Sequence, residues 1–245
     1  MTGPDFSVDR SRDAESRRTL FDSANVLIVT RPPQALPRAA MGQPGSRSSH
    51  VPTEPDMFLA VRGDGGVVAF NGHVDLGTGI GTALAQIVAE ELDVPLTRVS
   101  VVLGHTAEAP DQGPTIASAT IQISAVPLRQ AAAQARHFLV DEAARRWNVG
   151  AELLDVRDGI VHRRDGDIAA GFAYAELIGG RRIELDLAPD TPLKSPDEYR
   201  IVGKSAPRVD IPAKATGELV FVHDVRVPGM LHGRVVRPPY AGIAQ

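Results

Sequence analysis

The spacing of apolar residues between positions 57 and 103 changes from that of strands to that of a helix and back, which limits the folds open to the chain. Two β-rich runs, 58–61 and 67–70, flank an Arg-Gly-Asp-Gly-Gly turn and predict a hairpin. Apolar residues then recur at helical intervals over 80–92, and 99–103 is apolar enough for another short strand. We therefore expect an α+β (mixed α/β) fold, in which hairpins and a small sheet are packed by helices.

The same mixture of elements continues to residue 187. A long helical stretch is predicted over 116–147, with a kink or break at Pro127 because proline removes a helical hydrogen bond. Asp158-Gly159 predicts a second hairpin turn, 172–178 a short helix and 183–187 an alternating strand. The 80–92 and 116–147 helices are therefore expected to cover the sheet.

Composition shifts divide the chain into three predicted regions. Residues 1–55 are rich in charge, proline, glycine and serine, and are predicted to form an extended arm with one short strand at 25–30. Residues 56–190 carry the first folded domain, and a proline-rich linker follows it. A second module is predicted over 196–245 from short β-branched runs at 199–202, 219–222 and 232–236. These runs require a buried partner face, so the segment is expected to be mobile or to self-associate when the chain is made alone.

Composition also excludes several classes of chemistry. The 245 residues contain no cysteine, so disulfides, thiolate ligands and thiol nucleophiles are absent from this chain. Acidic residues (30) outnumber lysine plus arginine (26), and aromatic residues make up only 4%, which argues against a nucleic-acid partner. No apolar run approaches the roughly 18 residues of a membrane span. A cytoplasmic location is predicted, with a membrane-associated or periplasm-facing complex as the alternative.

A glycine-rich loop before the 80–92 helix is the first candidate binding site. Gly77-Thr78-Gly79-Ile80-Gly81 allows close backbone approach and offers N–H groups at a helix start, which favour phosphate. Thr82 stands where a dinucleotide-binding fingerprint requires its last glycine, and the acidic residue expected about twenty positions later is missing. A ligand-free turn, another anion site and, remotely, a nicotinamide site are the alternatives.

The second candidate site is 112–121, where small hydroxyls precede a predicted helix. Thr115, Ser118 and Thr120, with the backbone donors beside them, suit an anionic ligand that forms hydrogen bonds. The alternative is that Thr115 caps the helix while the other two residues are tolerated fillers. The residues alone leave both alternatives open.

The pattern assigns no catalytic residue and no protein-held metal. The seven histidines have no metal-ligand spacing with one another and are expected to be surface or hydrogen-bonded core residues. Asp75 lies in the glycine-rich loop and is expected to bind backbone N–H groups, since no partner carboxylate stands near it for acid–base work. No Ser/His/Asp triad is recognisable.

Two stretches of the sequence resemble the molybdenum hydroxylases, the xanthine dehydrogenase and aldehyde oxidase family, in their large molybdopterin-binding subunit. They are Asn71-Gly72-His73-Val74-Asp75-Leu76-Gly77-Thr78-Gly79-Ile80 and Gly113-Pro114-Thr115-Ile116-Ala117-Ser118-Ala119-Thr120, in the family's order and at similar spacing. Segments 199–204, 210–217 and 225–233 resemble the opening of the family's hammerhead domain. This order resembles the rearranged branch of isoquinoline 1-oxidoreductase beta subunits, and the motifs are most similar to the nicotinate dehydrogenase type.

The resemblance implies part of a molybdenum-cofactor-binding domain followed by an incomplete α/β hammerhead domain. It implies a molybdenum–molybdopterin cofactor, in the cytosine dinucleotide form, whose metal is held by the pterin rather than by protein side chains. The residues that match the cofactor-contacting segments are Gly77, Thr78, Gly79, Gln112, Gly113, Thr115, Ser118 and Thr120. We expect the two segments to converge in space, although they are far apart in sequence.

The resemblance also implies an oxidoreductase activity and its partners. The reaction would be oxidative hydroxylation of an N-heteroaromatic substrate such as nicotinate. Electrons would leave through a [2Fe–2S] small subunit and then a cytochrome c or flavin acceptor. A partner carrying the remaining molybdopterin-binding portion is implied as well.

The sequence departs from the family pattern at two points. The family loop often has glutamine where Thr78 stands, so backbone groups are expected to replace a side-chain contact. The Gly-x-Gly-Glu motif that carries the family's catalytic glutamate is not found in this sequence. The chain is therefore expected to be an N-terminal portion that does not turn over alone. The alternative is a non-catalytic truncated fragment with a structural or assembly role.

Overall fold

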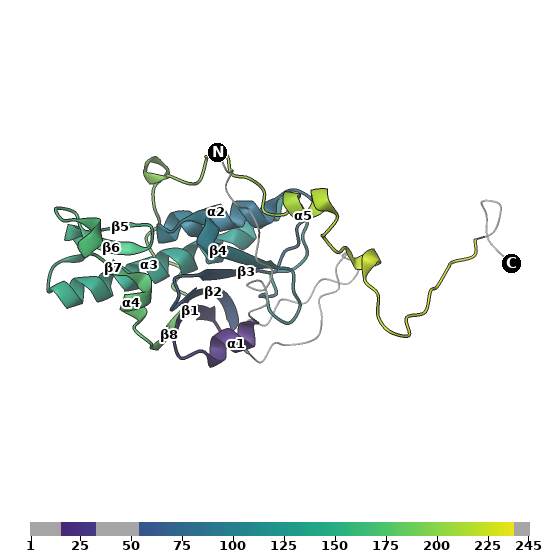
Figure 1. Cartoon of the computed structure of the whole chain (residues 1–245), viewed down its shortest axis with the longest axis horizontal. Helices are drawn as coiled ribbons and strands as arrows, with labels where there is room; N and C mark the ends of the chain where they lie inside the picture. Colours follow the sequence, from purple (N-terminus) through teal and green to yellow (C-terminus); the bar gives the residue numbers. More distant parts are fainter. Residues whose placement is uncertain (1–15, 33–53, 238–245) are drawn as a thin grey trace. The chain divides into compact units, whose positions relative to one another are not determined.

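Five strands form the main sheet of the computed structural model, which describes residues 16–32 and 54–237. Their order across the sheet is β4–β3–β2–β1–β8 (Figure 1). The three central strands pair antiparallel, whereas β4 joins β3 and β8 joins β1 in parallel. The strands are β1 (Val26–Arg31), β2 (Asp56–Arg62), β3 (Val67–Asn71), β4 (Val99–Leu103) and β8 (Arg182–Asp186). The strand predicted at 25–30 is thus β1, an inner strand of the sheet.

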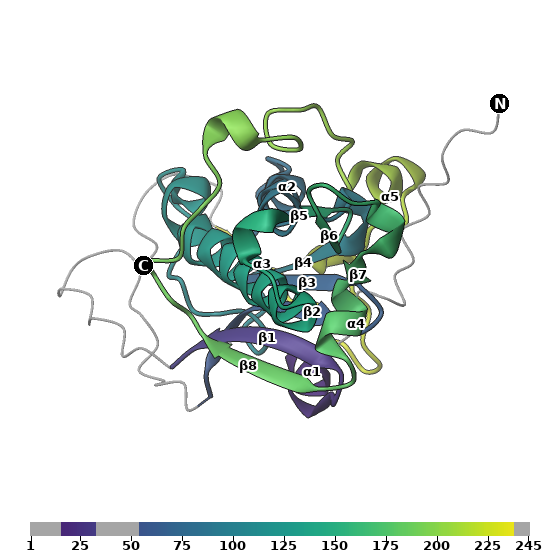
Figure 2. The ribbon, with the colours of Figure 1, turned by 90° about the vertical axis from the view of Figure 1, so that its left-hand side faces the viewer.

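Side chains of the central strands alternate between two buried faces, as strand geometry requires. Leu27 and Val29 of β1 belong to a large core that includes residues of α2 (Ile80–Leu92) and α3 (Ala125–Trp147). Val26 and Ile28 belong to a smaller core, which Leu20 of α1 (Arg17–Asp22) completes. Figure 2 shows α2 and α3 over one face of the sheet and α1 over the other. Because both faces are covered, the apolar residues of β1, β2 and β3 follow one another without alternation, at 26–29, 57–61 and 67–70.

A second sheet of three strands follows α3. It contains β5 (Leu154–Arg157), β6 (Ile160–Arg163) and β7 (Phe172–Ala173), and α4 (Tyr174–Ile178) comes directly after it. Asp158 and Gly159 both have positive φ, 54° and 74°, as a type I′ hairpin turn requires. The Tyr174 hydroxyl donates to the Leu92 carbonyl at 2.8 Å, which ties this sheet to the end of α2.

Most elements predicted up to residue 187 are confirmed, including both hairpins, the 80–92 helix and the strand at 99–103. The predicted 183–187 strand is β8, displaced by one residue, and the predicted helix at 172–178 is β7 followed by α4. The predicted start of the long helix at residue 116 is wrong. A π-helical turn spans Thr120–Ser124 and α3 starts at Ala125. Pro127 falls three residues after this π-helical turn, and the chain stays helical through it, so the predicted break at Pro127 does not occur.

The β-branched runs at 199–202, 219–222 and 232–236, on which the prediction of a second module rests, form no strand in the described part of the chain. Residues 194–209, which we call the strap, belong to the first compact unit, and that unit ends at Val209. Residue 196, where the second module is predicted to start, therefore lies in the first unit. The division into three domains stays a prediction. The second unit contains α5 (Ile211–Thr216) and a short 3-10 turn at Val222–Asp224.

Candidate functional site

The glycine-rich loop is folded around the carboxylate of Asp75. Oδ1 accepts hydrogen bonds from the N–H groups of Gly77 (2.8 Å) and Gly79 (3.2 Å), and Oδ2 accepts one from Gly81 (3.4 Å). Burial acts to raise the pKa of Asp75, but the N–H groups of Gly77, Gly79, Gly81 and Thr78 outweigh burial and lower that pKa. The expected role of Asp75 as a loop carboxylate is confirmed.

The bonds to Asp75 change what the loop can offer to a ligand. The N–H groups of Gly77 and Gly79, which the sequence analysis offered to a phosphate, are already bound within the loop. The Thr78 side chain is exposed at the tip, and a Cβ built on Gly77 meets no atom within 4 Å. A ligand can therefore approach the tip of this loop, but the start of α2 is occupied by an internal anion.

The second candidate segment meets the glycine-rich loop at its base. Gln112 accepts from the N–H of Gly72 (2.8 Å) through Oε1 and donates to the Ser124 carbonyl (2.8 Å) through Nε2. Thr115 Oγ1 accepts from the N–H of Val74 at 3.0 Å. The two segments therefore converge, and two of the predicted ligand side chains hold them together.

A buried polar cluster fastens the same two segments below the surface. The His73 ring nitrogen Nδ1 lies 2.8 Å from Thr120 Oγ1, and the Ser124 hydroxyl also reaches the ring. Asn71 accepts from the N–H of His73 and donates to the Ser124 carbonyl, both at 3.1 Å. His73 is thus a hydrogen-bonded core histidine, as expected. Sequence reasoning missed Asn71 and Ser124 as its partners.

The tip of the second segment has an unusual backbone. Ala117 and Ser118 both adopt left-handed conformations, with φ of 52° and 53°, although neither is glycine. The π-helical turn at Thr120–Ser124 follows immediately. Strained residues and π-helical turns both cluster at functional sites. The backbone therefore supports a binding role for this tip independently of the sequence motif.

The surface around the two tips combines hydroxyl and apolar groups. Ser118 is exposed like Thr78, and the apolar side chains Leu76 and Ile123 are 71% and 68% exposed. No group of three or more His, Cys, Asp or Glu that could hold a metal occurs within 16–32 and 54–237. This donor set fits a flat ring with polar edges, such as a pterin that carries its own metal ligands, better than a bare metal ion.

The buried carboxylates of α2 are engaged elsewhere. Glu90 accepts from the backbone N–H groups of residues 200–202 at 2.6–3.1 Å. Glu91 forms an ion pair with Arg129 at 2.7 Å. Neither carboxylate is therefore available as a base beside the two tips.

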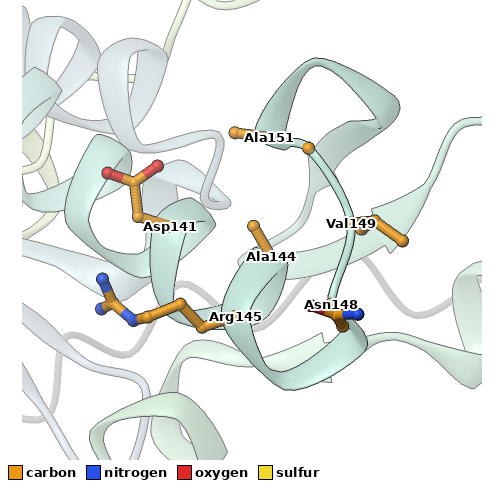
Figure 3. A pocket seen from close by; sticks show the side chains of 7 residues that line it. Asp141, Ala144, Arg145, Asn148, Val149 and Ala151 are labelled. Carbon is orange, nitrogen blue, oxygen red and sulfur yellow. The ribbon is translucent and has the colours of Figure 1, made fainter.

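A hollow in the described part of the chain lies away from these segments (Figure 3). It has a volume of about 420 Å³ and lies at the C-terminal end of α3, between Asp141 and Ala151. Asp141 and Arg145 are its charged residues, and it contains none of the predicted site residues. The motif, the convergence and the backbone strain point to the loop tips rather than to this hollow.

Comparison with known proteins shows which family contains these loops. Residues 39–209 match the model of the molybdopterin cofactor-binding domain, and both loops and the strap lie within the match. The chain therefore belongs to the molybdopterin cofactor-binding domain family.

Among individual relatives, a subunit of nicotinate dehydrogenase from Pseudomonas putida is 52% identical over 96% of this chain. The beta subunit of isoquinoline 1-oxidoreductase from Brevundimonas diminuta is 34% identical over 94% of it. This chain spans 19% and 34% of the lengths of these relatives. Quinoline 2-oxidoreductase from Pseudomonas putida 86 superposes with a TM-score of 0.41 and 29% identity, covering 49% of this chain and 15% of that one.

Proposed function

We propose that this chain is a molybdopterin-binding part of a molybdenum hydroxylase, an oxidoreductase that hydroxylates an N-heteroaromatic ring of the nicotinate type. The observation that carries the proposal is the convergence of two exposed loops, one of them with a strained tip, inside the segment that matches the cofactor-binding family. The 52% identity to a nicotinate dehydrogenase subunit favours nicotinate over other ring substrates.

The predicted site residues divide into two roles in this proposal. Thr78 and Ser118 are exposed at the tips and hold the cofactor directly, while Gly77 and Gly113 have no side chain and let the cofactor approach the backbone closely. Gln112, Thr115 and Thr120 orient those tips through the bonds described above. When bound, molybdopterin supplies the redox chemistry of its molybdenum, while the chain supplies binding and orientation.

The finer assignments extend the same proposal. The cofactor is the cytosine dinucleotide form, and the partners are a [2Fe–2S] small subunit, the remaining molybdopterin-binding portion, and a cytochrome c or flavin acceptor. Within residues 16–32 and 54–237, no helix is both long and apolar enough to cross a membrane. We propose the cytoplasm as its location.

The test compares cofactor retention between matched double variants. The chain is produced in a host that makes molybdopterin, and the purified protein is assayed for pterin by fluorescence after oxidation. We expect T78V/S118A to retain at least about fivefold less pterin than the native chain, since each hydroxyl contributes one hydrogen bond. The control T97V/S205A changes the same residue types at exposed positions outside both loop segments and should retain pterin normally.

The outcome also separates the alternatives. Equal retention in both double variants would show that the tips do not hold the cofactor. A native chain that retains no pterin would instead favour the structural or assembly role.

A further inference from the structure

The strap is fastened along one polar face of α2, which the sequence analysis treated only as an amphipathic helix. Thr82, Gln86 and Glu90 are spaced four residues apart and therefore share a face. Glu90 accepts from the N–H groups of residues 200–202, and Gln86 donates to the carbonyls of Ile201 (3.1 Å) and Lys204 (3.0 Å). Thr82 Oγ1 accepts from the N–H of Val209 at 3.1 Å. The strap therefore runs antiparallel to the helix, from its C-terminal to its N-terminal end.

The far end of the strap is fixed by charge. Lys194 Nζ pairs with Asp93 (2.5 Å) and donates to the carbonyl of Glu90 (2.6 Å). Arg129 of α3 donates to the Lys194 carbonyl at 2.8 Å and lies over the ring of Tyr199, 5.6 Å from its centre. Lys194 fixes the start of the strap, Glu90 fixes its middle and Thr82 binds Val209, so the backbone at 208 and 209 is held in place.

That end places Arg208 against the glycine-rich loop. Arg208 Nη1 donates to the carbonyl of Gly77 at 3.1 Å. The rest of its side chain packs on Gly79, where an added Cβ would lie 2.9 Å from Nε and 3.0 Å from Cδ. Gly79 also has a φ of 78°, so it serves both the turn and the close approach of the arginine.

We propose that Arg208 is a positioning residue for cofactor binding, which sets the conformation in which the Gly77–Gly79 tip meets the ligand. The inference rests on the proposed molybdopterin-binding function. The loop is held from two directions: Asp75 binds its N–H groups, and the Arg208 guanidinium binds the Gly77 carbonyl. With both held, the tip presents Thr78 outward in one conformation. The strap thereby connects the C-terminal end of α2 to the ligand-facing end of the loop.

The first measurement is amide hydrogen exchange of the peptide 75–81 in the full chain without cofactor. Loss of a charged donor to the Gly77 carbonyl should speed exchange in R208Q about fivefold to tenfold. R208K keeps a donor but loses the planar group that packs on Gly79, so its exchange rate should lie between those of the native chain and R208Q. The matched control is R200Q, because the side chain of Arg200 is exposed on the same strap. Exchange within 84–92 reports whether α2 itself stays folded.

The second measurement is pterin retention by the same variants, made in the molybdopterin-producing host. R208Q should retain less pterin than R200Q while its melting temperature stays close to that of R200Q. If neither R208Q nor R208K exchanges faster at 75–81 than the native chain, the assignment of Arg208 is overturned. If R208Q exchanges faster but even the native chain retains no pterin, Arg208 positions the loop and the proposed cofactor function is what fails.

Discussion

Glu90 is a carboxylate that is 2% exposed on a helix that otherwise packs on the sheet. Burial acts to raise its pKa, but the backbone N–H groups of Val202, Ile201 and Arg200, with Lys194 nearby, lower it below the ordinary value of 4.5. Each of those N–H groups would be unpaired without the carboxylate. Glu90 is therefore a main attachment of the strap to α2, beside Gln86, Thr82 and the ion pair of Lys194.

The first prediction concerns Glu90 and pH. Because the pKa of Glu90 is lower in the folded state than in the unfolded state, its stabilisation is fully present above pH 4.5 and is lost as the pH falls toward the folded pKa. Glu90→Gln should lower the free energy of unfolding by about 3 kcal/mol at neutral pH. It should also weaken the dependence of stability on acid, to which other carboxylates with lowered pKa values, such as Asp75 and Glu142, contribute as well.

Urea unfolding at neutral pH and below pH 4.5 measures both effects on Glu90→Gln. Glu152→Gln is the matched control, since Glu152 is exposed on the surface. An unchanged pH slope in Glu90→Gln would mean that the Glu90 carboxylate contributes nothing to the acid dependence of folding.

At the residue scale, the sequence predicted where polar groups gather better than it predicted what they bind. Asp75 was expected to bind backbone N–H groups, and it does. Gln112 and Thr120 matched cofactor segments, yet their side chains join the two loops. A hydroxyl or amide at a loop-to-helix junction serves a ligand or the protein's own backbone equally well. Only the fold decides which partner is within reach.

Hairpin turns are the elements that the sequence specifies most directly. Asp158-Gly159 fixes its turn because a type I′ turn needs positive φ at both central residues. By contrast, the β-branched run 199–202 forms no strand, since its N–H groups bind Glu90 rather than a neighbouring strand. Strand propensity expresses packing against neighbours, and no pattern in the run itself indicates that its neighbour is a helix.

The second prediction tests turn geometry with three glycine-to-alanine variants. Gly159→Ala should lower the free energy of unfolding most, by about 1–2 kcal/mol. Gly159 has positive φ, and an added Cβ would lie 3.2 Å from Arg98 Nη1 and 3.3 Å from Val94 Cγ1. Gly180→Ala should cost about 1 kcal/mol, because Gly180 has a φ of 71° in open space. Gly233→Ala, with neither feature, should have no effect. Thermal unfolding gives the ranking, and equal costs for all three would contradict the role of φ.

The whole molecule combines a well-packed first unit with a second unit that exposes apolar side chains. Within the described part of the second unit, Leu231 and Val236 are each 92% exposed, and Val227 and Val235 are also exposed. Soluble monomers rarely present so many apolar residues in one short stretch.

The third prediction is that the chain made alone associates through this stretch. Sedimentation velocity at rising concentration should show oligomers that the double variant L231S/V236S reduces. The control L153S/L193S removes two exposed leucines of the first unit and should leave association unchanged. Association that persists fully in L231S/V236S would place the contact elsewhere.

The strand order gives the first unit a definite sequence of events during translation. β1 is made early, but its parallel neighbour β8 emerges only with residues 182–186. The Glu90 carboxylate gains its N–H partners even later, because they lie at 200–202. A ribosome that slows before residue 182 therefore holds a nascent chain with an open sheet edge at β1 and with a Glu90 carboxylate that lacks its backbone partners. Each such pause lengthens the time in which that edge can pair with another nascent chain on the same messenger RNA.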